Sequence, residues 1–265
     1  MNPTEREAYV YRDWQALGKR VPRLGLAGLT GLKKDLVDQA YEGGIRFFFW
    51  AMPTSASPES IAPVRGERDN CILATGASLD VLISPRRTVE RCLKKLRLDY
   101  LDIFLLLWVR SERRMKVFDE LASLRDEGKV RQIGISSHDR PLAVAVANRF
   151  PLDVLMVRYN AAHRESEIEV FSQLRNPRPE IITFTATHWG RLLKPPPGWP
   201  QEKEVPTAVG CYQFVLSNPN VDACLMRPRN RDELDQNLST LSRAPLSPAE
   251  QKKIREFGDA VRSQS

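Results

Sequence analysis

The sequence has few cysteines and no closely spaced cysteine pair. Its 265 residues include four, Cys71, Cys92, Cys211 and Cys224. Disulfide-stabilised secreted domains are short and dense in cysteine. This composition excludes a disulfide scaffold, and we expect reduced thiols in a cytoplasmic protein.

Long hydrophobic runs and a leader-like start are also missing. The longest uncharged apolar run, Ile103 to Val109, is far shorter than the roughly 20 residues needed to cross a bilayer. The first ten residues, MNPTEREAYV, are polar, so we expect no signal peptide and no membrane partner.

The excess of positive charge is spread along the chain. Lys and Arg total 40 against 33 Asp and Glu, a net charge of +7. The basic pairs at 86–87, 94–95 and 113–114 lie in segments that also carry acidic residues. This distribution is typical of solvated helix faces, and we expect no nucleic-acid partner.

Apolar runs alternate with helical or crossover segments along residues 1–265, which we interpret as a single domain. Eight such βα units in about 250 residues indicate a (β/α)8 (TIM) barrel. A doubly wound sheet is the alternative, but no G-x-G-x-x-G follows the first run. A capping box at Ser247 to Glu250 predicts a last helix over 248–261. The eight predicted strands are Val21–Ala27, Ile45–Phe49, Cys71–Thr75, Leu101–Leu107, Val130–Ser136, Asp153–Arg158, Ile181–Thr185 and Val221–Met226.

Four segments then stand out by their motifs. They read YEGGIRFFFWA at 41–51, VERCLKKLRLDYLDIFLLLW at 89–108, LRDEGKVRQIGIS at 124–136 and VDACLMRPRNRDELDQNL at 221–238. In this order they resemble the aldo-keto reductase family over about residues 20–242. The resemblance implies an α/β TIM barrel of the aldo-keto reductase type. The barrel is shortened, because Ala51–Asp69 replaces the usual second loop and helix.

The resemblance also implies an activity whose residues are absent. Family members reduce carbonyls with NADPH, using an Asp, Tyr, Lys and His tetrad. The matching positions hold Phe49, Thr54, Gly76 and Leu107, and an aliphatic alcohol is too weak an acid to replace the Tyr phenol near neutral pH. We therefore expect a ligand- or NADPH-binding pseudo-reductase.

The cofactor positions implied by the resemblance are mixed. Ser136 matches the residue that binds the nicotinamide amide, while Arg229 and Asn237 match the contacts to the 2′-phosphate and adenine. The neighbouring positions depart from the family, with Met156 for a Gln and Arg227 for a Gly. NADPH binding at a weakened site is expected. In the alternative interpretation these residues serve salt bridges and helix capping, and no cofactor binds.

Active sites of this fold lie at the carboxyl ends of the strands, here called the barrel mouth. An aromatic-lined pocket for a small-molecule ligand is one interpretation of the residues expected there. The other is that bulky side chains fill an unused mouth. The candidate pocket residues are Trp50, Trp108, His138, Asn160, Trp189 and Arg227.

The three histidines of the chain follow three successive predicted strands. His163 and His188, with Tyr159, are the candidate catalytic residues for a rebuilt site. Such a site performs either NADP-dependent redox chemistry or non-redox lyase- or isomerase-type chemistry. We expect no metal, with a Zn²⁺ site of His138, His163 and His188 as the alternative. A protein-interaction scaffold is a third hypothesis. The ligand, oligomeric state and pathway stay open.

Overall fold

The computed structural model describes residues 3–28, 33–52, 57–78 and 84–264. Within this part of the chain, eight parallel strands close into a barrel in the order β10-β3-β4-β5-β6-β7-β8-β9. The strands are β3 (Leu24–Gly28), β4 (Phe47–Met52), β5 (Ile72–Ser78), β6 (Leu101–Leu107), β7 (Val130–Ser136), β8 (Val154–Arg158), β9 (Glu180–Phe184) and β10 (Ala223–Met226).

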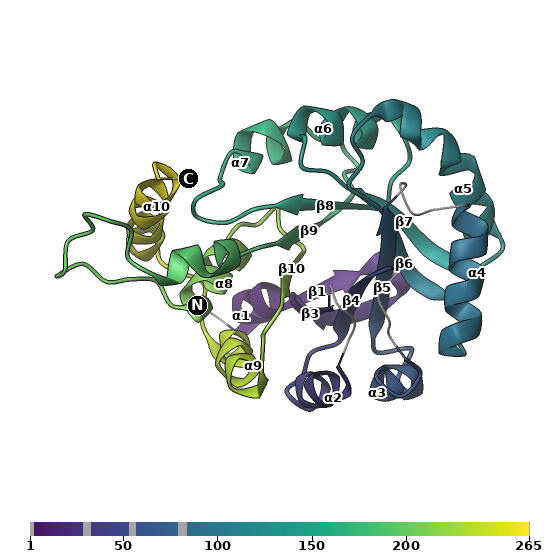
Figure 1. Cartoon of the computed structure of the whole chain (residues 1–265), viewed down its shortest axis with the longest axis horizontal. Helices are drawn as coiled ribbons and strands as arrows, with labels where there is room; N and C mark the ends of the chain where they lie inside the picture. The colour runs from purple at the N-terminus through teal and green to yellow at the C-terminus, as the bar shows by residue number, and fades with distance from the viewer. Residues whose placement is uncertain (1–2, 29–32, 53–56, 79–83, 265) are drawn as a thin grey trace.

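Helices surround the barrel (Figure 1). The α-helices are α1 (Pro3–Val10), α2 (Lys34–Glu42), α3 (Ala62–Gly66), α4 (Pro85–Leu96), α5 (Phe118–Asp126), α6 (Arg140–Arg149), α7 (Ser166–Glu169), α8 (Ala208–Leu216), α9 (Arg231–Leu238) and α10 (Pro248–Arg262). Short 3-10 helices are η1 (Gln15–Leu17), η2 (Glu112–Val117), η3 (Phe171–Gln173), η4 (His188–Leu193) and η5 (Ser239–Ser242). The predicted (β/α)8 barrel is confirmed. In the described residues, no helix is long and apolar enough to cross a membrane.

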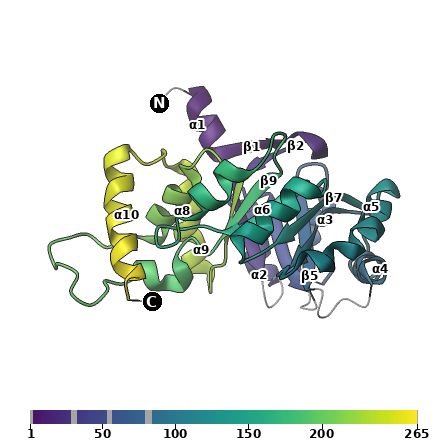
Figure 2. The ribbon, with the colours of Figure 1, turned by 90° about the horizontal axis from the view of Figure 1, so that it is seen from above.

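The first strand prediction was wrong in detail. Val21–Ala27 is not one strand, because β2 (Lys19–Pro22) ends there and pairs antiparallel with β1 (Tyr11–Trp14). The hairpin closes the amino-terminal end of the barrel, where Trp14 packs edge-on against Phe47 with 5.5 Å between ring centroids. In Figure 2 this hairpin lies across the upper end of the barrel. It leaves the opposite end as the mouth.

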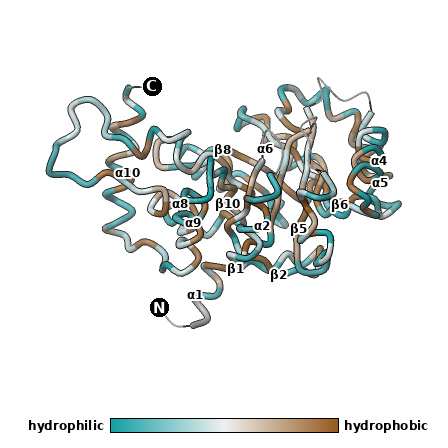
Figure 3. The backbone as a smooth tube through the Cα atoms, turned by 60° about the horizontal axis from the view of Figure 1, so that its bottom comes forward, coloured by the Kyte–Doolittle hydropathy of each residue, from teal (hydrophilic) through white to brown (hydrophobic). Residues whose placement is uncertain are grey.

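Two apolar clusters follow from the alternation of side chains along each strand. One fills the space between barrel and helices. The other lies inside the barrel and combines the hairpin residues Trp14, Leu17 and Val21 with inward residues of the strands. In Figure 3 the hydrophobic colour runs along the strands, whereas the loop between η4 and α8 is largely hydrophilic. The inward strand residues are Phe47, Phe49, Ala51, Ile72, Ala74, Ile103, Leu105, Leu107, Val154, Met156, Ile182, Ala223 and Leu225.

At the foot of three strands an aspartate makes the same two kinds of contact, and two of the three carboxylates, Asp102 and Asp222, are buried. Asp102, Asp153 and Asp222 each accept a hydrogen bond from a backbone N–H of the neighbouring strand and pair with an arginine. The backbone donors are Leu73, Ile133 and Ile181, at 2.9, 2.8 and 2.6 Å. The arginines are Arg68, Arg125 and Arg178. Each pairing fixes the register of two adjacent strands.

Glu180, at the foot of β9, predicts a pH dependence of stability. Burial and the Asp222 carboxylate raise the pKa of Glu180 to about 7, although Arg12 lies 3.2 Å away. Because the folded pKa lies above the unfolded one, this group's contribution falls as pH rises from about 4.5 to about 7. We expect Glu180→Gln to gain about 1–2 kcal/mol relative to wild type between pH 5 and pH 8, less than the full shift since the carboxylate is partly solvated. Urea unfolding at pH 5 and pH 8 measures the unfolding free energy of both proteins. If the difference between the variant and wild type is the same at the two pH values, the prediction is contradicted.

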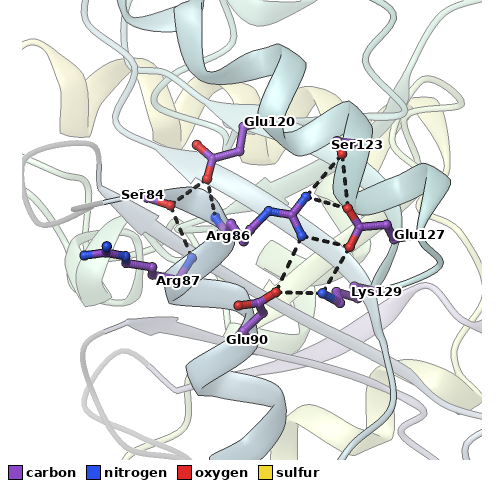
Figure 4. A network of polar contacts seen from close by, with 8 residues as sticks. All are labelled: Ser84, Arg86, Arg87, Glu90, Glu120, Ser123, Glu127 and Lys129. Atoms are coloured by element: carbon purple, nitrogen blue, oxygen red, sulfur yellow. Dashed lines mark hydrogen bonds and ion pairs between the residues drawn. The ribbon is translucent and has the colours of Figure 1, made fainter.

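Helices α4 and α5 are joined by a polar network (Figure 4). Arg86 bridges to Glu127 at 2.5 Å, and Lys129 binds Glu90 at 2.6 Å. Glu120 accepts from the hydroxyl of Ser84, the N-cap of α4. Because these pairs are exposed to solvent, they add little stability.

The cysteines are buried and free. Burial raises the pKa of Cys71 to about 11 and that of Cys92 to about 12. The thiols are therefore uncharged and unreactive near neutral pH.

Candidate active site at the barrel mouth

On β4 and β6 the barrel interior is apolar up to the mouth, and β5 is apolar up to Gly76, with buried Ser78 at its end in register with Leu107. Phe49 and Leu107 belong to the interior cluster and are almost fully buried. Gly76 lies on the same face as Ala74, and a Cβ there would stand 2.5 Å from the Leu105 carbonyl oxygen. The neighbouring strand therefore closes on the position that matches the family's lysine. Thr54 lies outside the described residues.

Trp50 does not line the mouth. It alternates with Phe49 along β4, so its ring faces outward into the cluster between barrel and helices, where it is 1% exposed. Since successive strand residues point to opposite faces, Trp50 and Phe49 could not both be inward. The pocket assignment of Trp50 is corrected to a packing role.

Tyr159 is likewise turned away from the barrel axis. Its hydroxyl donates to Glu167 at 2.5 Å and accepts from Asn218 at 3.1 Å, and its ring stacks on Phe214. Burial, with the hydrogen bond to Glu167, raises the pKa of Tyr159. A phenol held in this way is no proton donor for a ligand at the mouth, so its predicted catalytic role is not supported by its position.

Asn160 is fully buried and organises the loop after β8. Its side-chain amide donates to the Thr185 carbonyl at 2.8 Å, and its oxygen accepts from the backbone N–H of Ala162 and His163 at 3.0 Å each. Its hydrogen bonds hold the loop after β8 against the end of β9. Asn160 thus positions His163.

Ser136, predicted to bind nicotinamide, ends β7 next to Met156 on β8. Its hydroxyl oxygen accepts from the Trp108 backbone N–H at 3.0 Å. Trp108 itself is 41% exposed and has φ of 54°. The hydroxyl of Ser136 therefore fixes the strained residue that starts the loop after β6.

Backbone strain concentrates at the mouth. Trp108, Thr185, His188 and Trp189 all have φ between 49° and 60°, a region that non-glycine residues rarely adopt. All four follow the carboxyl ends of β6 or β9. Strain kept at such positions is typical of functional sites. Trp189 is also 64% exposed, so two strained tryptophans face solvent beside the mouth.

Two of the three histidines meet. The rings of His163 and His188 lie 4.7 Å apart, edge to face. His138 instead sits against Phe184 at 5.7 Å. In the described ranges no group of three histidine, cysteine or acidic side chains is placed to hold a metal. The structure therefore does not bring the three histidines of the Zn²⁺ alternative together.

All three imidazoles are kept from protonation. Burial, followed by the charges of Arg158 and other groups, lowers the pKa of His163 to about 4. The pKa of His188 is lowered by burial, Arg191 and Arg158, and that of His138 by burial, Arg158 and Arg110. Because their pKa values are lowered, His163 and His188 are neutral near pH 7. The cation that acts on all three histidines is Arg158.

Arg158 was missed in the sequence and could have been found there. Val154 and Met156 face the interior, and alternation by two places Arg158 on the same face. In the register it pairs with Phe184, the last residue of β9. A lone basic residue at the inward end of an apolar strand was the signal.

The positions matched to the adenosine phosphate follow β10, one before α9 and one within it. The side chain of Arg229 is 87% exposed and binds Glu233 at 2.6 Å, while Asn237 is buried in α9 and Arg227 is exposed. Arg229 is free to turn toward a phosphate, but it must leave Glu233 to do so.

Helix α10 secures the segment that carries His163. Arg255 binds Glu167 with both guanidinium nitrogens, at 3.0 and 2.7 Å, and Arg164 binds Asp259 at 2.7 Å. Gly258 lies directly on the Ala161 backbone. The capping box predicted at Ser247 is present at the start of this helix. We call these contacts between α10 and residues 161–167 the α10 clasp.

Comparisons with known proteins agree with this architecture. A sequence model described as the aldo/keto reductase family matches residues 64–194. Aldo-keto reductase YhdN of Bacillus subtilis (strain 168) is 33% identical over 141 residues, 48% of this chain and 42% of the relative. Methylglyoxal reductase DkgA of Yersinia pestis is 30% identical over 76 residues, 28% and 27% of the two chains. The chain thus matches less than half the length of either relative.

Solved structures match over nearly the whole chain. The holo form of aldo-keto reductase AKR11C1 from Bacillus halodurans has a TM-score of 0.77 at 18% identity, covering 93% of this chain and 95% of its own. An aldo/keto reductase from Klebsiella pneumoniae in complex with NADP and acetate has a TM-score of 0.72 at 19% identity, covering 91% and 92%. At these identities the likeness establishes the shared barrel fold.

Proposed function

We propose that the chain is a member of the aldo-keto reductase family, and that it binds NADPH or another small ligand at the barrel mouth without the family's carbonyl-reducing chemistry. The observation that carries the proposal is the apolar arc of β4, β5 and β6. Phe49 and Leu107 offer no proton, and the strand packed against Gly76 leaves no space for a side chain there. Without a proton donor beside the carbonyl, hydride transfer to it lacks its general acid.

The residues present fit the phosphate-bearing end of NADPH better than the nicotinamide end. The exposed guanidinium of Arg229 has the planar fork that suits a phosphate. At the other end Ser136 already binds the Trp108 backbone, and the neighbouring Met156 cannot hydrogen-bond an amide strongly. When bound, NADPH would supply a hydride donor. The chain's own part is to hold the adenosine phosphate with the exposed Arg229.

A titration tests the proposal. NADPH added to the protein should quench the exposed mouth tryptophans, Trp108 and Trp189, while aldehydes and ketones are reduced more slowly than about 0.01 per second, far below the roughly 10 per second of a typical enzyme. Arg229→Gln should weaken NADPH binding and leave NADH binding unchanged, since only NADPH has the 2′-phosphate. Turnover near 1 per second overturns the proposal of lost chemistry, and failure of every nucleotide to bind removes NADPH as the ligand.

A rebuilt enzyme is the second candidate, and one observation favours it. The buried nitrogens of His163 and His188 have no hydrogen-bond partner within the described chain. A neutral imidazole with a free nitrogen is able to accept a proton. With Tyr159 bound to Glu167, the histidine pair alone would carry this chemistry.

A further inference from the structure

Arg158 stands at the mouth without a counter-charge. Its guanidinium is half-buried, and within the described part of the chain no ion pair or hydrogen bond involves it. Burial and the charges of Arg140 and Arg262 lower its pKa. Those two arginines differ from it, because both bind Glu165 and Arg140 also binds Glu169 at 2.9 Å. A half-buried cation with no carboxylate is costly unless something else supplies the negative charge.

Unpartnered nitrogens belong to the two histidines whose pKa values the charge of Arg158 lowers. His188 is only 3% exposed, yet neither of its ring nitrogens has a partner in the described residues, and the same holds for Nε2 of His163. Each neutral imidazole carries one N–H donor. Buried polar atoms normally find partners, so several missing ones in one place call for an explanation. Here the explanation must also satisfy a positive charge.

We propose that Arg158, His163 and His188 form a binding site for an oxyanion, the phosphate or carboxylate group of the ligand that the mouth takes. A guanidinium fork binds two oxygens of either group, and the two imidazoles donate to a further oxygen of a phosphate or to the second lone pairs of the two carboxylate oxygens. This proposal rests on the proposed function, since it names the chemistry of the same mouth. It is separate from Arg229, which lies between β10 and α9 and binds Glu233.

The site couples anion binding to proton uptake. His163 is faced by Arg158 on β8, Arg140 on α6, Arg262 on α10 and His188 on η4, with Glu165 between Arg140 and Arg262. An oxyanion at Arg158 cancels the charge that disfavours imidazolium, so the pKa values of the histidines rise and protons bind with the anion. By linkage, affinity increases as pH falls.

Sulfate is the probe of choice because it stays fully ionised between pH 5 and 8, and acetate represents a carboxylate. Calorimetry and the NMR signals of the imidazole rings follow each titration, and the chain has only three histidines to assign. We expect sulfate or acetate to bind about fivefold more tightly at pH 5.5 than at pH 7.5 and to raise the pKa of His163. Arg158→Gln should weaken anion binding at least about tenfold. Because it removes a positive charge that lowers the pKa of His163, it should also raise that pKa without any anion.

Two further variants complete the design. His188→Asn keeps a polar group but loses the ring, and we expect it to weaken anion binding while Arg158 remains. Arg87→Gln, on the exposed face of α4, is the matched control that removes one arginine far from the mouth. Tighter binding of sulfate than of acetate indicates a phosphate-type ligand, and tighter binding of acetate indicates a carboxylate.

The proposal is overturned if neither anion binds with a Kd below about 20 mM, or if the Arg158→Gln and Arg87→Gln variants have equal affinity for the anions. Failure here is distinguishable from failure of the proposed function. If NADPH binds and sulfate affinity is the same with and without Arg158, only the oxyanion site is disproved. If sulfate binding requires Arg158 but no nucleotide binds, the oxyanion site stands and the NADPH assignment is disproved.

Discussion

Replacing Asp102 by Ala should cost about 3–5 kcal/mol of unfolding free energy, the range for one partner of a buried ion pair. Asp102 is fully buried and accepts from Lys19, from Arg68 at 2.6 Å and from the Leu73 backbone N–H at 2.9 Å. Lys19 is itself buried, and burial lowers its pKa. The variant leaves this ammonium without its carboxylate. Guanidinium unfolding with an unchanged slope measures the loss.

Asp153 provides the matched control. It plays the same part at the foot of β8, but it is 26% exposed and its partner Arg125 is 30% exposed. Because solvent screens this pair, Asp153→Ala should cost only about 1 kcal/mol. Equal losses in the two variants would show that burial does not set the strength of the repeated strand-foot device.

The substitution Gly258→Ala should detach the α10 clasp and destabilise the protein by about 1–3 kcal/mol, as overpacking does. A Cβ at this position would stand 2.2 Å from the Ala161 carbonyl oxygen, which is backbone and cannot move aside alone. The gain in helix propensity, about 1 kcal/mol, is too small to offset the contact. Faster proteolysis within 248–262 and a shifted His163 NMR signal report the detachment.

Gly210 in α8 controls for helix propensity. There a Cβ would meet only the Thr207 hydroxyl at 3.5 Å and Ile254 at 3.7 Å, ordinary contacts. Gly210→Ala should therefore be neutral or stabilising by up to about 1 kcal/mol. If both alanine variants behave alike, close packing of α10 on Ala161 is not what requires glycine at 258.

The barrel was predictable because its strands are short apolar runs whose motifs occur in a fixed order. Leu101–Leu107 and Val130–Ser136 have the predicted bounds. The failure at Val21–Ala27 has a physical cause: Val21 packs inside the barrel like a strand residue, but it does so from the hairpin that closes the end. An apolar run alone does not distinguish a barrel strand from a strand that plugs it.

The site was less predictable, for two reasons. The parity of β8 was readable, since an inward Met156 requires an inward Arg158 and turns Tyr159 outward. The partners of these residues were not readable, because Glu167 is bound by Arg255 from α10, far along the chain. Equal spacing of the histidines likewise could not reveal that His163 meets His188 while His138 stays apart.

The α10 clasp also imposes an order on how the molecule is completed as it is synthesised. The last barrel strand ends at Met226, whereas α10 begins at Pro248. Every barrel strand is therefore synthesised before the helix that fixes residues 161–167. A chain that ends before α10 has all the barrel strands but lacks the contacts that hold the loop carrying His163. A ligand that requires this loop thus distinguishes the complete molecule from a chain that has not yet added α10.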